Sequence, residues 1–144
     1  MKYMLDTNIF NALLDGVIEI KDLPPNAEFV VTAMQLQEIN KTKNEERRAL
    51  LLKQFHEIAP DRVPTSSSLW NVTSWGEGCY GESKIFREIL ELLNLKNNSK
   101  KNNYVDALIA ETALTMNVTL ITSDRDLVSI VSELDGLIIF HEYL

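Results

Sequence analysis

The sequence has little cysteine and histidine, and this scarcity excludes several kinds of site. Its 144 residues include one cysteine, Cys79, and two histidines, His56 and His141. A single cysteine cannot form a disulfide within the chain, and no Cys or His pair has the spacing of a zinc site. We therefore interpret Cys79 as an isolated thiol rather than a nucleophile, and His56 as a helix residue rather than a general base.

Long apolar runs are also absent. No segment approaches the roughly 18 residues of a membrane span, and Asp6 and Asp15 interrupt the region where a signal peptide would be apolar. We therefore expect a cytoplasmic protein that does not enter a membrane. A composition of 45% hydrophobic and 24% charged residues is typical of a globular protein. The length predicts one domain, residues 1–144, with a proper core.

Basic residues are too few for a surface that coats nucleic acid. The formal net charge is −7, which argues against a generally basic binding face. It does not exclude a nucleic-acid substrate. If four or five carboxylates surround divalent cations, they account for more than half of the excess negative charge, and each ion supplies positive charge locally.

What the sequence does contain is an alternation of short apolar runs with helical stripes of apolar residues. The runs predict strands at 3–5, 29–31, 62–63, 118–121 and 137–140, and the stripes predict helices at 9–14, from 33, 45–58, 83–95, 103–116 and after 126. Strands separated by helices imply right-handed crossovers. We predict an α/β fold, a three-layer sandwich with a central, mostly parallel sheet of about five strands. Residues 65–81 have no clear period.

The stretch KYMLDTN, residues 2–8, predicts the position of a functional site. Asp6 directly follows the apolar run of the first strand and precedes a helical stripe. It would therefore lie at the carboxyl end of that strand, the edge at which open α/β sheets bind ligands. The alternative is that Asp6 only caps the next helix, because Asp is a good N-cap residue.

Three more carboxylates occupy comparable places. Asp124 follows the fourth strand, Glu38 is about two turns into a helix, and Asp106 is in the first turn of another. Each has a simpler interpretation, since most helix glutamates are solvated and a first-turn aspartate stabilises the helix dipole. If the four converge, they repel one another unless a cation binds. Oxygen ligands without histidine or thiolate favour Mg²⁺ or Mn²⁺.

The sequence resembles the PIN-domain ribonucleases, in particular the small single-domain toxins of the VapC type. The matching segments are MLDTN around Asp6, VTAMQLQEI around Glu38, VDALIAETA around Asp106 and LITSDRDL around Asp124. They extend over residues 4–127, nearly the whole chain, and the order of four weak motifs is more specific than any one of them. The resemblance implies a PIN-like fold that binds one or two Mg²⁺ or Mn²⁺ ions and cleaves phosphodiester bonds in RNA.

The family's functional residues map onto this sequence position by position. The resemblance implies that Asp6, Glu38, Asp106 and Asp124 are the catalytic metal ligands and that Asp126 is an accessory ligand. It further implies that Thr7, Asn8 and Ser123 orient ligands or the attacking water. Candidates for holding substrate phosphates are Lys84, Arg87, Lys100 and Lys101, although surface solvation is the simpler role for each. Trp70 and Trp75 suit base stacking or packing against a core.

The same resemblance implies a cognate antitoxin as partner and a homodimer. Two alternatives keep the fold: a module that binds RNA or a partner without turnover, and an RNA-processing nuclease outside a toxin–antitoxin system. A receiver domain is disfavoured, because Val63–Thr65 lacks its phosphoacceptor aspartate and no lysine follows the fifth strand. A haloacid-dehalogenase-type phosphatase would need a second aspartate where Asn8 stands.

Overall fold

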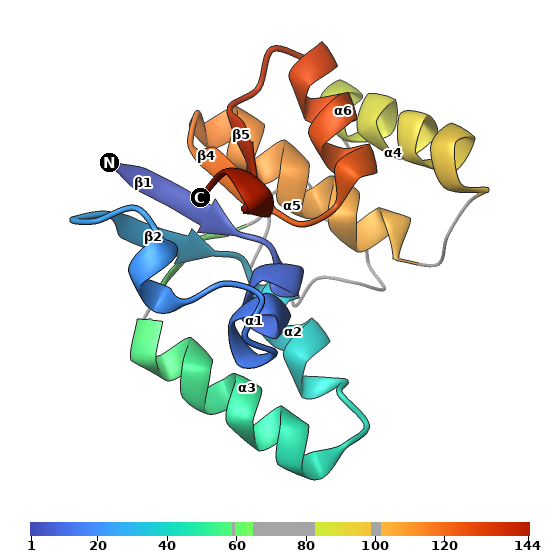
Figure 1. Ribbon diagram of the computed structural model, residues 1–144. Helices are drawn as coiled ribbons and strands as arrows, with labels where there is room; N and C mark the ends of the chain where they lie inside the picture. Colours follow the sequence, from blue (N-terminus) through green and yellow to red (C-terminus); the bar gives the residue numbers. More distant parts are fainter. Residues whose placement is uncertain (59, 65–82, 99–101) are drawn as a thin grey trace.

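Five strands and six helices make up the part of the chain that the computed structural model describes, residues 1–58, 60–64, 83–98 and 102–144 (Figure 1). The strands are β1 (Lys2–Leu5), β2 (Glu28–Val31), β3 (Asp61–Arg62), β4 (Thr119–Thr122) and β5 (Ile138–Phe140). The helices are α1 (Thr7–Leu14), α2 (Ala33–Asn40), α3 (Glu45–Ile58), α4 (Lys84–Asn97), α5 (Asn103–Met116) and α6 (Arg125–Glu133), with short 3₁₀ helices η1 (Ile20–Asp22) and η2 (His141–Tyr143). Trp70, Trp75, Cys79, Lys100 and Lys101 lie outside the described residues.

The strands form one sheet in the order β3-β2-β1-β4-β5, and all four pairings are parallel. The predicted α/β class and parallel sheet of about five strands are therefore confirmed. The chain builds outward from β1 to β2 and β3, then returns to the other side of β1 with β4 and β5. The strand order thus reverses between β1 and β4, and such a switch point opens a crevice at the carboxyl ends of the strands.

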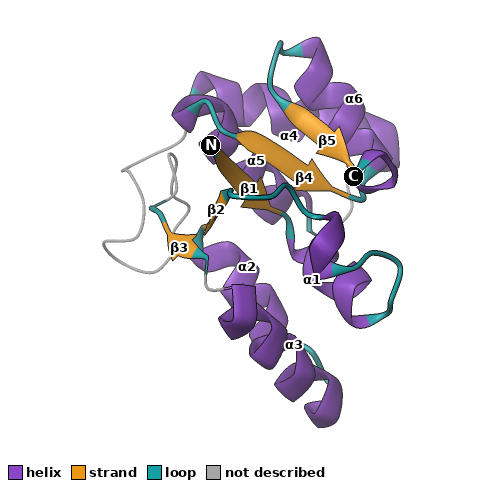
Figure 2. Ribbon diagram, turned by 60° about the vertical axis from the view of Figure 1, so that its left-hand side comes forward, coloured by secondary structure: helices purple, strands orange, loops and turns teal. Residues whose placement is uncertain are grey.

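The sheet is buried on both faces, which explains why its strands are continuous apolar runs. Met4, Val30 and Leu120 belong to one core cluster with residues of α4, α5 and α6. Their neighbours Leu5, Val31 and Ile121 belong to a second cluster with residues of α1 and α3. Because side chains alternate along a strand, these two sets point to opposite faces. Figures 1 and 2 show the resulting layers, with α4, α5 and α6 on one side of the sheet and α3 on the other.

Several element boundaries differ from the prediction by one or two residues, and two of these differences have a clear local reason. Strand β4 begins at Thr119 rather than 118, because Asn117 adopts a left-handed conformation with φ of 55°. This turn lets the Val118 amide donate to Ala113 O at 3.0 Å, so Val118 caps the end of α5 rather than starting the strand. Helix α4 continues to Asn97, two residues past its predicted end, and also closes on a left-handed asparagine, Asn98.

Helix α2 is fastened to the end of β1. A capping box starts the helix, with Met34 N donating to Thr32 Oγ1 at 3.1 Å and Thr32 N donating to Gln35 Oε1 at 2.9 Å. The buried Gln35 amide also donates to Leu5 O at 3.0 Å. This bond holds the start of α2 beside the residue that precedes Asp6.

Candidate metal centre

Asp6 lies at the switch point and is held by three hydrogen bonds. It directly follows β1 and caps α1, with its Oδ1 accepting from Thr7 N at 2.8 Å. Its Oδ2 accepts from Thr122 Oγ1 at 2.8 Å and from Asn8 Nδ2 at 3.2 Å. The two interpretations of Asp6 are therefore compatible, because one carboxylate oxygen caps the helix while the residue stands at the ligand-binding edge.

Burial makes the charged form of Asp6 costly. Its side chain is 3% exposed, and burial is the main reason that its pKa rises to about 6. The negative charge of Asp124 raises the pKa further, whereas the hydrogen bonds from Thr122, Thr7 and Asn8 lower it. Asp124, at the end of the neighbouring strand β4, therefore lies close enough for its charge to act on Asp6.

Glu38 comes from α2 to the same place. Its Oε1 accepts a 2.7 Å hydrogen bond from Thr7 Oγ1, so Thr7 bridges Glu38 and Asp6 with its hydroxyl and its amide. Burial raises the pKa of Glu38 to about 7, and the charge of Asp6 adds to the rise. The hydrogen bond from Thr7 and the charge of Lys41 oppose it. Glu38 is thus part of an acidic group rather than a solvated helix glutamate.

Asp124 joins the group from the other side of the switch point. It caps α6, with Oδ1 accepting from Asp126 N at 2.9 Å and from Leu127 N at 3.3 Å. The neighbouring Ser123 amide donates to Asn8 Oδ1 at 3.0 Å. Asp126 is half-buried in the first turn of α6. The predicted accessory residues Thr7, Asn8 and Ser123 therefore connect the loops that carry the carboxylates.

Asp106 is placed by a helix rather than by a strand. It is half-buried in the first turn of α5, where its amide donates to Asn102 O at 3.0 Å. Helix α5 leads into β4, and Figure 1 shows that it begins on the side toward which β1 and β2 point. The crossover therefore brings its first turn to the carboxyl edge of the sheet.

The donor chemistry of the site fits a hard divalent cation. Asp6 and Glu38 are carboxylates whose ionised forms are disfavoured by burial and mutual repulsion, and a cation would relieve both. Among the described residues, no three carboxylate, histidine or cysteine side chains approach closely enough to form a ready-made metal site. The four-residue ligand set with Asp126 as accessory stays a prediction.

Thr122 is a site residue that sequence reasoning missed. Its fully buried hydroxyl donates to Asp6 and accepts from the Asp124 amide at 3.1 Å, so it joins β1 to the loop after β4. A threonine at the end of an otherwise apolar strand, directly before Ser123 and Asp124, is the signal that could have revealed it.

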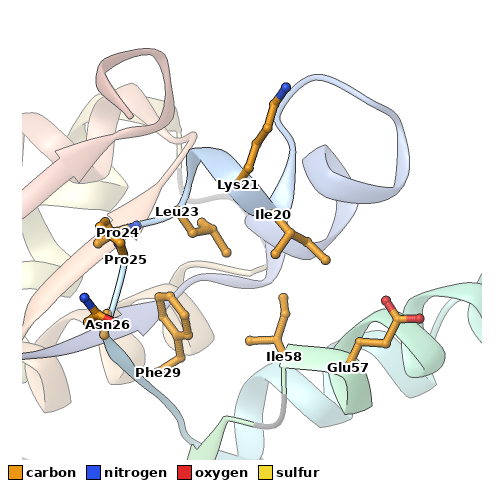
Figure 3. Close-up of a pocket in the computed structure, with 10 residues that line it drawn as sticks. Ile20, Lys21, Leu23, Pro24, Pro25, Asn26, Phe29, Glu57 and Ile58 are labelled. Atoms are coloured by element: carbon orange, nitrogen blue, oxygen red, sulfur yellow. The ribbon is translucent and has the colours of Figure 1, made fainter.

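A separate pocket of about 340 Å³ lies away from the acidic edge (Figure 3). Its lining includes Ile20, Leu23, Phe29 and Ile58, from η1, the start of β2 and the end of α3. None of the predicted site residues lines it.

The fold and the site together define a PIN-like α/β protein with an acidic switch point. No protein-family model matches the sequence, and no curated protein matches it. Several solved structures do match. VapBC2 from Rickettsia felis, bound to a promoter DNA fragment, matches with a TM-score of 0.55, 20% identity and coverage of 97% of this chain and 98% of that one. VapBC-1 from nontypeable Haemophilus influenzae matches with a TM-score of 0.55, 23% identity and coverage of 99% of each chain. PAE2754 from Pyrobaculum aerophilum matches with a TM-score of 0.51 and 14% identity, over 99% of this chain and 91% of that one.

These likenesses concern the fold of nearly the whole chain. The solved neighbours include VapBC structures, so the fold implied by the resemblance to VapC-type PIN domains is confirmed. No helix in the described part of the chain has the length and apolarity needed to cross a membrane.

Proposed function

We propose that this protein is a metal-dependent ribonuclease and the toxin of a toxin–antitoxin pair. The observation that carries the proposal is the pair of acids formed by the buried Asp6 and the half-buried Glu38, which Thr7 bridges at the sheet's switch point beside Asp124. The fold shared with VapBC structures supports the same function. A buried acidic group has a large desolvation cost, and metal binding is the simplest function that offsets it.

Asp6, Glu38, Asp106 and Asp124 would hold Mg²⁺ or Mn²⁺, with Asp126 as an accessory ligand. When bound, the ion supplies positive charge that favours ionisation of water and offsets charge on the phosphodiester. Thr122 and Asn8 fix the orientation of Asp6 through its Oδ2. Thr7 fixes Glu38 through Oε1, which leaves Oε2 for a ligand or a proton. With a pKa of about 7, Glu38 exchanges a proton readily at neutral pH.

The test is cleavage of a fluorogenic RNA during a Mn²⁺ titration, beside a phosphatase substrate and an EDTA control. We expect RNA cleavage that requires the metal and little release from the phosphatase substrate. Asp6→Asn should remove most activity while the protein stays folded, because it removes a ligand charge. Glu133→Gln, an exposed acid at the end of α6, is the matched control and should keep full activity. An Asp6→Asn protein that cleaves at the wild-type rate refutes the proposal.

The titration also separates the alternatives. A module that binds RNA without turnover would bind the labelled RNA and leave it intact at every Mn²⁺ concentration. An RNA-processing nuclease outside a toxin–antitoxin system would cleave RNA but lack a partner. A small antitoxin-like reading frame directly beside this one, whose product copurifies with the protein and inhibits cleavage, would identify the toxin.

Cytoplasmic location and homodimerisation belong to the same proposal. The location is expected from the lack of long apolar runs in the sequence, and the dimer is implied by the resemblance to VapC-type toxins. Light scattering of the purified protein should give twice the 16.4 kDa mass of the chain. A monomer at micromolar concentration would contradict the proposed dimer without affecting the ribonuclease proposal.

A further inference from the structure

Aromatic and charged side chains gather at the end of β5, next to the acidic edge. Phe140, the last residue of β5, pairs in register with Thr122, the last residue of β4. The segments that follow, Ser123 and Asp124 after β4 and η2 after β5, therefore leave the sheet side by side. Figure 2 shows the C-terminus beside the end of β4. Strand neighbours are about 4.8 Å apart, so η2 borders the candidate metal centre.

Arg125 connects the end of β5 with the residues that follow β4. It directly follows Asp124 and begins α6, and its guanidinium lies 4.9 Å from the centre of the Phe140 ring. Stacking orients the guanidinium plane and leaves its N–H edge available for an anion. Its ion pair with Glu142 is long, at 3.6 Å, and the Arg125 side chain is 77% exposed. Such an exposed pair is weak, so a substrate phosphate can replace the Glu142 carboxylate.

Tyr143 supplies an open aromatic surface next to this cation. Its ring centroid lies 6.2 Å from that of Phe140 at an interplanar angle of 61°, so the two rings meet edge to face. The residue is nevertheless 81% exposed. An exposed aromatic ring beside a stacked arginine matches how proteins bind single strands, with bases on rings and phosphates on cations.

We propose that Arg125 and Tyr143 form a subsite for single-stranded RNA on the β5 side of the carboxylates. Arg125 binds a phosphate next to the reacting phosphodiester, and a base stacks on the Tyr143 ring. When no substrate is present, the Glu142 carboxylate forms an ion pair with the Arg125 guanidinium. The subsite rests on the proposed ribonuclease function. It also explains how a protein with a net charge of −7 can hold a polyanion next to buried acids.

The subsite is tested by binding and by kinetics on the same variants. Binding of a labelled single-stranded RNA to metal-free protein is measured by fluorescence anisotropy at several salt concentrations. Cleavage of that RNA is measured with Mn²⁺. The variants are Arg125→Ala, Tyr143→Ala and Glu142→Gln. Lys53→Ala, which removes an exposed cation on α3, is the matched control.

The two contacts predict different signatures. Arg125→Ala should weaken binding and reduce the slope of log affinity against log salt by about 0.7, the value for one phosphate contact to a single strand. Tyr143→Ala should weaken binding by about tenfold without changing that slope, because stacking releases no counterion. Both should raise KM and leave kcat nearly unchanged. Glu142→Gln should tighten binding, since it removes the competing carboxylate.

The outcomes separate this inference from the proposed function. If the wild type cleaves RNA and Arg125→Ala and Tyr143→Ala behave like Lys53→Ala, the subsite is overturned and the ribonuclease stands. If the wild type binds RNA without cleavage and the variants bind more weakly, the subsite stands and the ribonuclease fails. Arg125→Gln, which keeps part of the packing on Phe140, replaces Arg125→Ala if the latter melts at a lower temperature.

Discussion

In the metal-free protein, ionised Glu38 lowers the stability of the fold, and binding of a metal at the proposed site would relieve this cost. Its pKa is raised from 4.5 to about 7 by burial and by the charge of Asp6. A raised folded-state pKa means that the folded state binds the proton more tightly than the unfolded state. The contribution of this group to stability is therefore fully present below pH 4.5 and is lost as the pH rises through 7.

Glu38→Gln should stabilise the metal-free protein at pH 8 because glutamine has no charge to bury. Glutamine can still accept the hydrogen bond from Thr7. We expect the free energy of unfolding to rise by about 2 kcal/mol at pH 8, and by much less at pH 5. Urea denaturation in EDTA at both pH values measures it, with exposed Glu57→Gln as the control. An equal gain at both pH values would show that charge burial is not the cause.

The hydroxyl of Thr122 is one of the groups that determine the pKa of Asp6. Its hydrogen bond lowers the pKa of Asp6, so Thr122→Val should raise that pKa and move the acidic limb of the pH–rate profile to higher pH. The lost bond should also cost about 1–3 kcal/mol of stability. Thr119→Val, at the other end of β4, is the matched control. A Thr122→Val profile that superimposes on the wild type contradicts the assignment of Thr122 to the site.

At the scale of elements, asparagine amides join α4 to the start of α5. The side chain of Asn103 is 1% exposed, and its Nδ2 donates to Asn94 Oδ1 and Asn97 Oδ1, each at 2.8 Å. Its Oδ1 accepts from Asn97 Nδ2 at 3.0 Å. These bonds fix the first turn of α5, which carries Asp106.

Asn103→Ala should lower the free energy of unfolding by about 2 kcal/mol, because it removes the three hydrogen bonds that the buried Asn103 amide makes with Asn94 and Asn97. The neighbouring Asn102→Ala is the matched control, since Asn102 is exposed and makes no capping bond with its side chain. Chemical denaturation measures both. If Asp106 is a metal ligand, Asn103→Ala should also weaken Mn²⁺ affinity, and equal stabilities for the two variants would contradict the role of the amide cluster.

At the scale of the whole molecule, metal binding should stabilise the fold because the carboxylates come from both halves of the sheet. Asp6 follows β1, Glu38 follows β2 and Asp124 follows β4. Mn²⁺ at 100 times its Kd should add about 2.7 kcal/mol, which raises the Tm by about 5–10 °C for a chain of this size. Thermal melts with and without Mn²⁺ at pH 8 measure this shift.

The shift should shrink at pH 5, where protons compete for Asp6 and Glu38, whose pKa values are about 6 and about 7. It should be largely absent in Asp6→Asn and unchanged in Glu133→Gln. A Tm shift of equal size in Asp6→Asn would place the ion at another part of the surface.

The sequence by itself determined the elements, and it supplied the candidate residues of the site. The apolar strands, the helix that starts at Ala33 and the helix that carries Asp106 all formed as predicted. These features depend on hydrogen bonds within a few residues and on the period of apolar side chains, both of which are visible along the chain. The four carboxylates were predicted from their positions after strands and near helix starts, together with the resemblance to PIN domains.

Only the tertiary structure decided which of these residues meet. The strand order places β4 beside β1, and this pairing brings Asp124 near Asp6 and gives Thr122 its role. The hydrogen bond from Thr7 to Glu38 and the contact of Arg125 with Phe140 likewise join residues far apart in sequence. Periodicity shows which face of an element is buried, whereas the choice of neighbours depends on how all the layers pack together. That packing is a property of the whole chain.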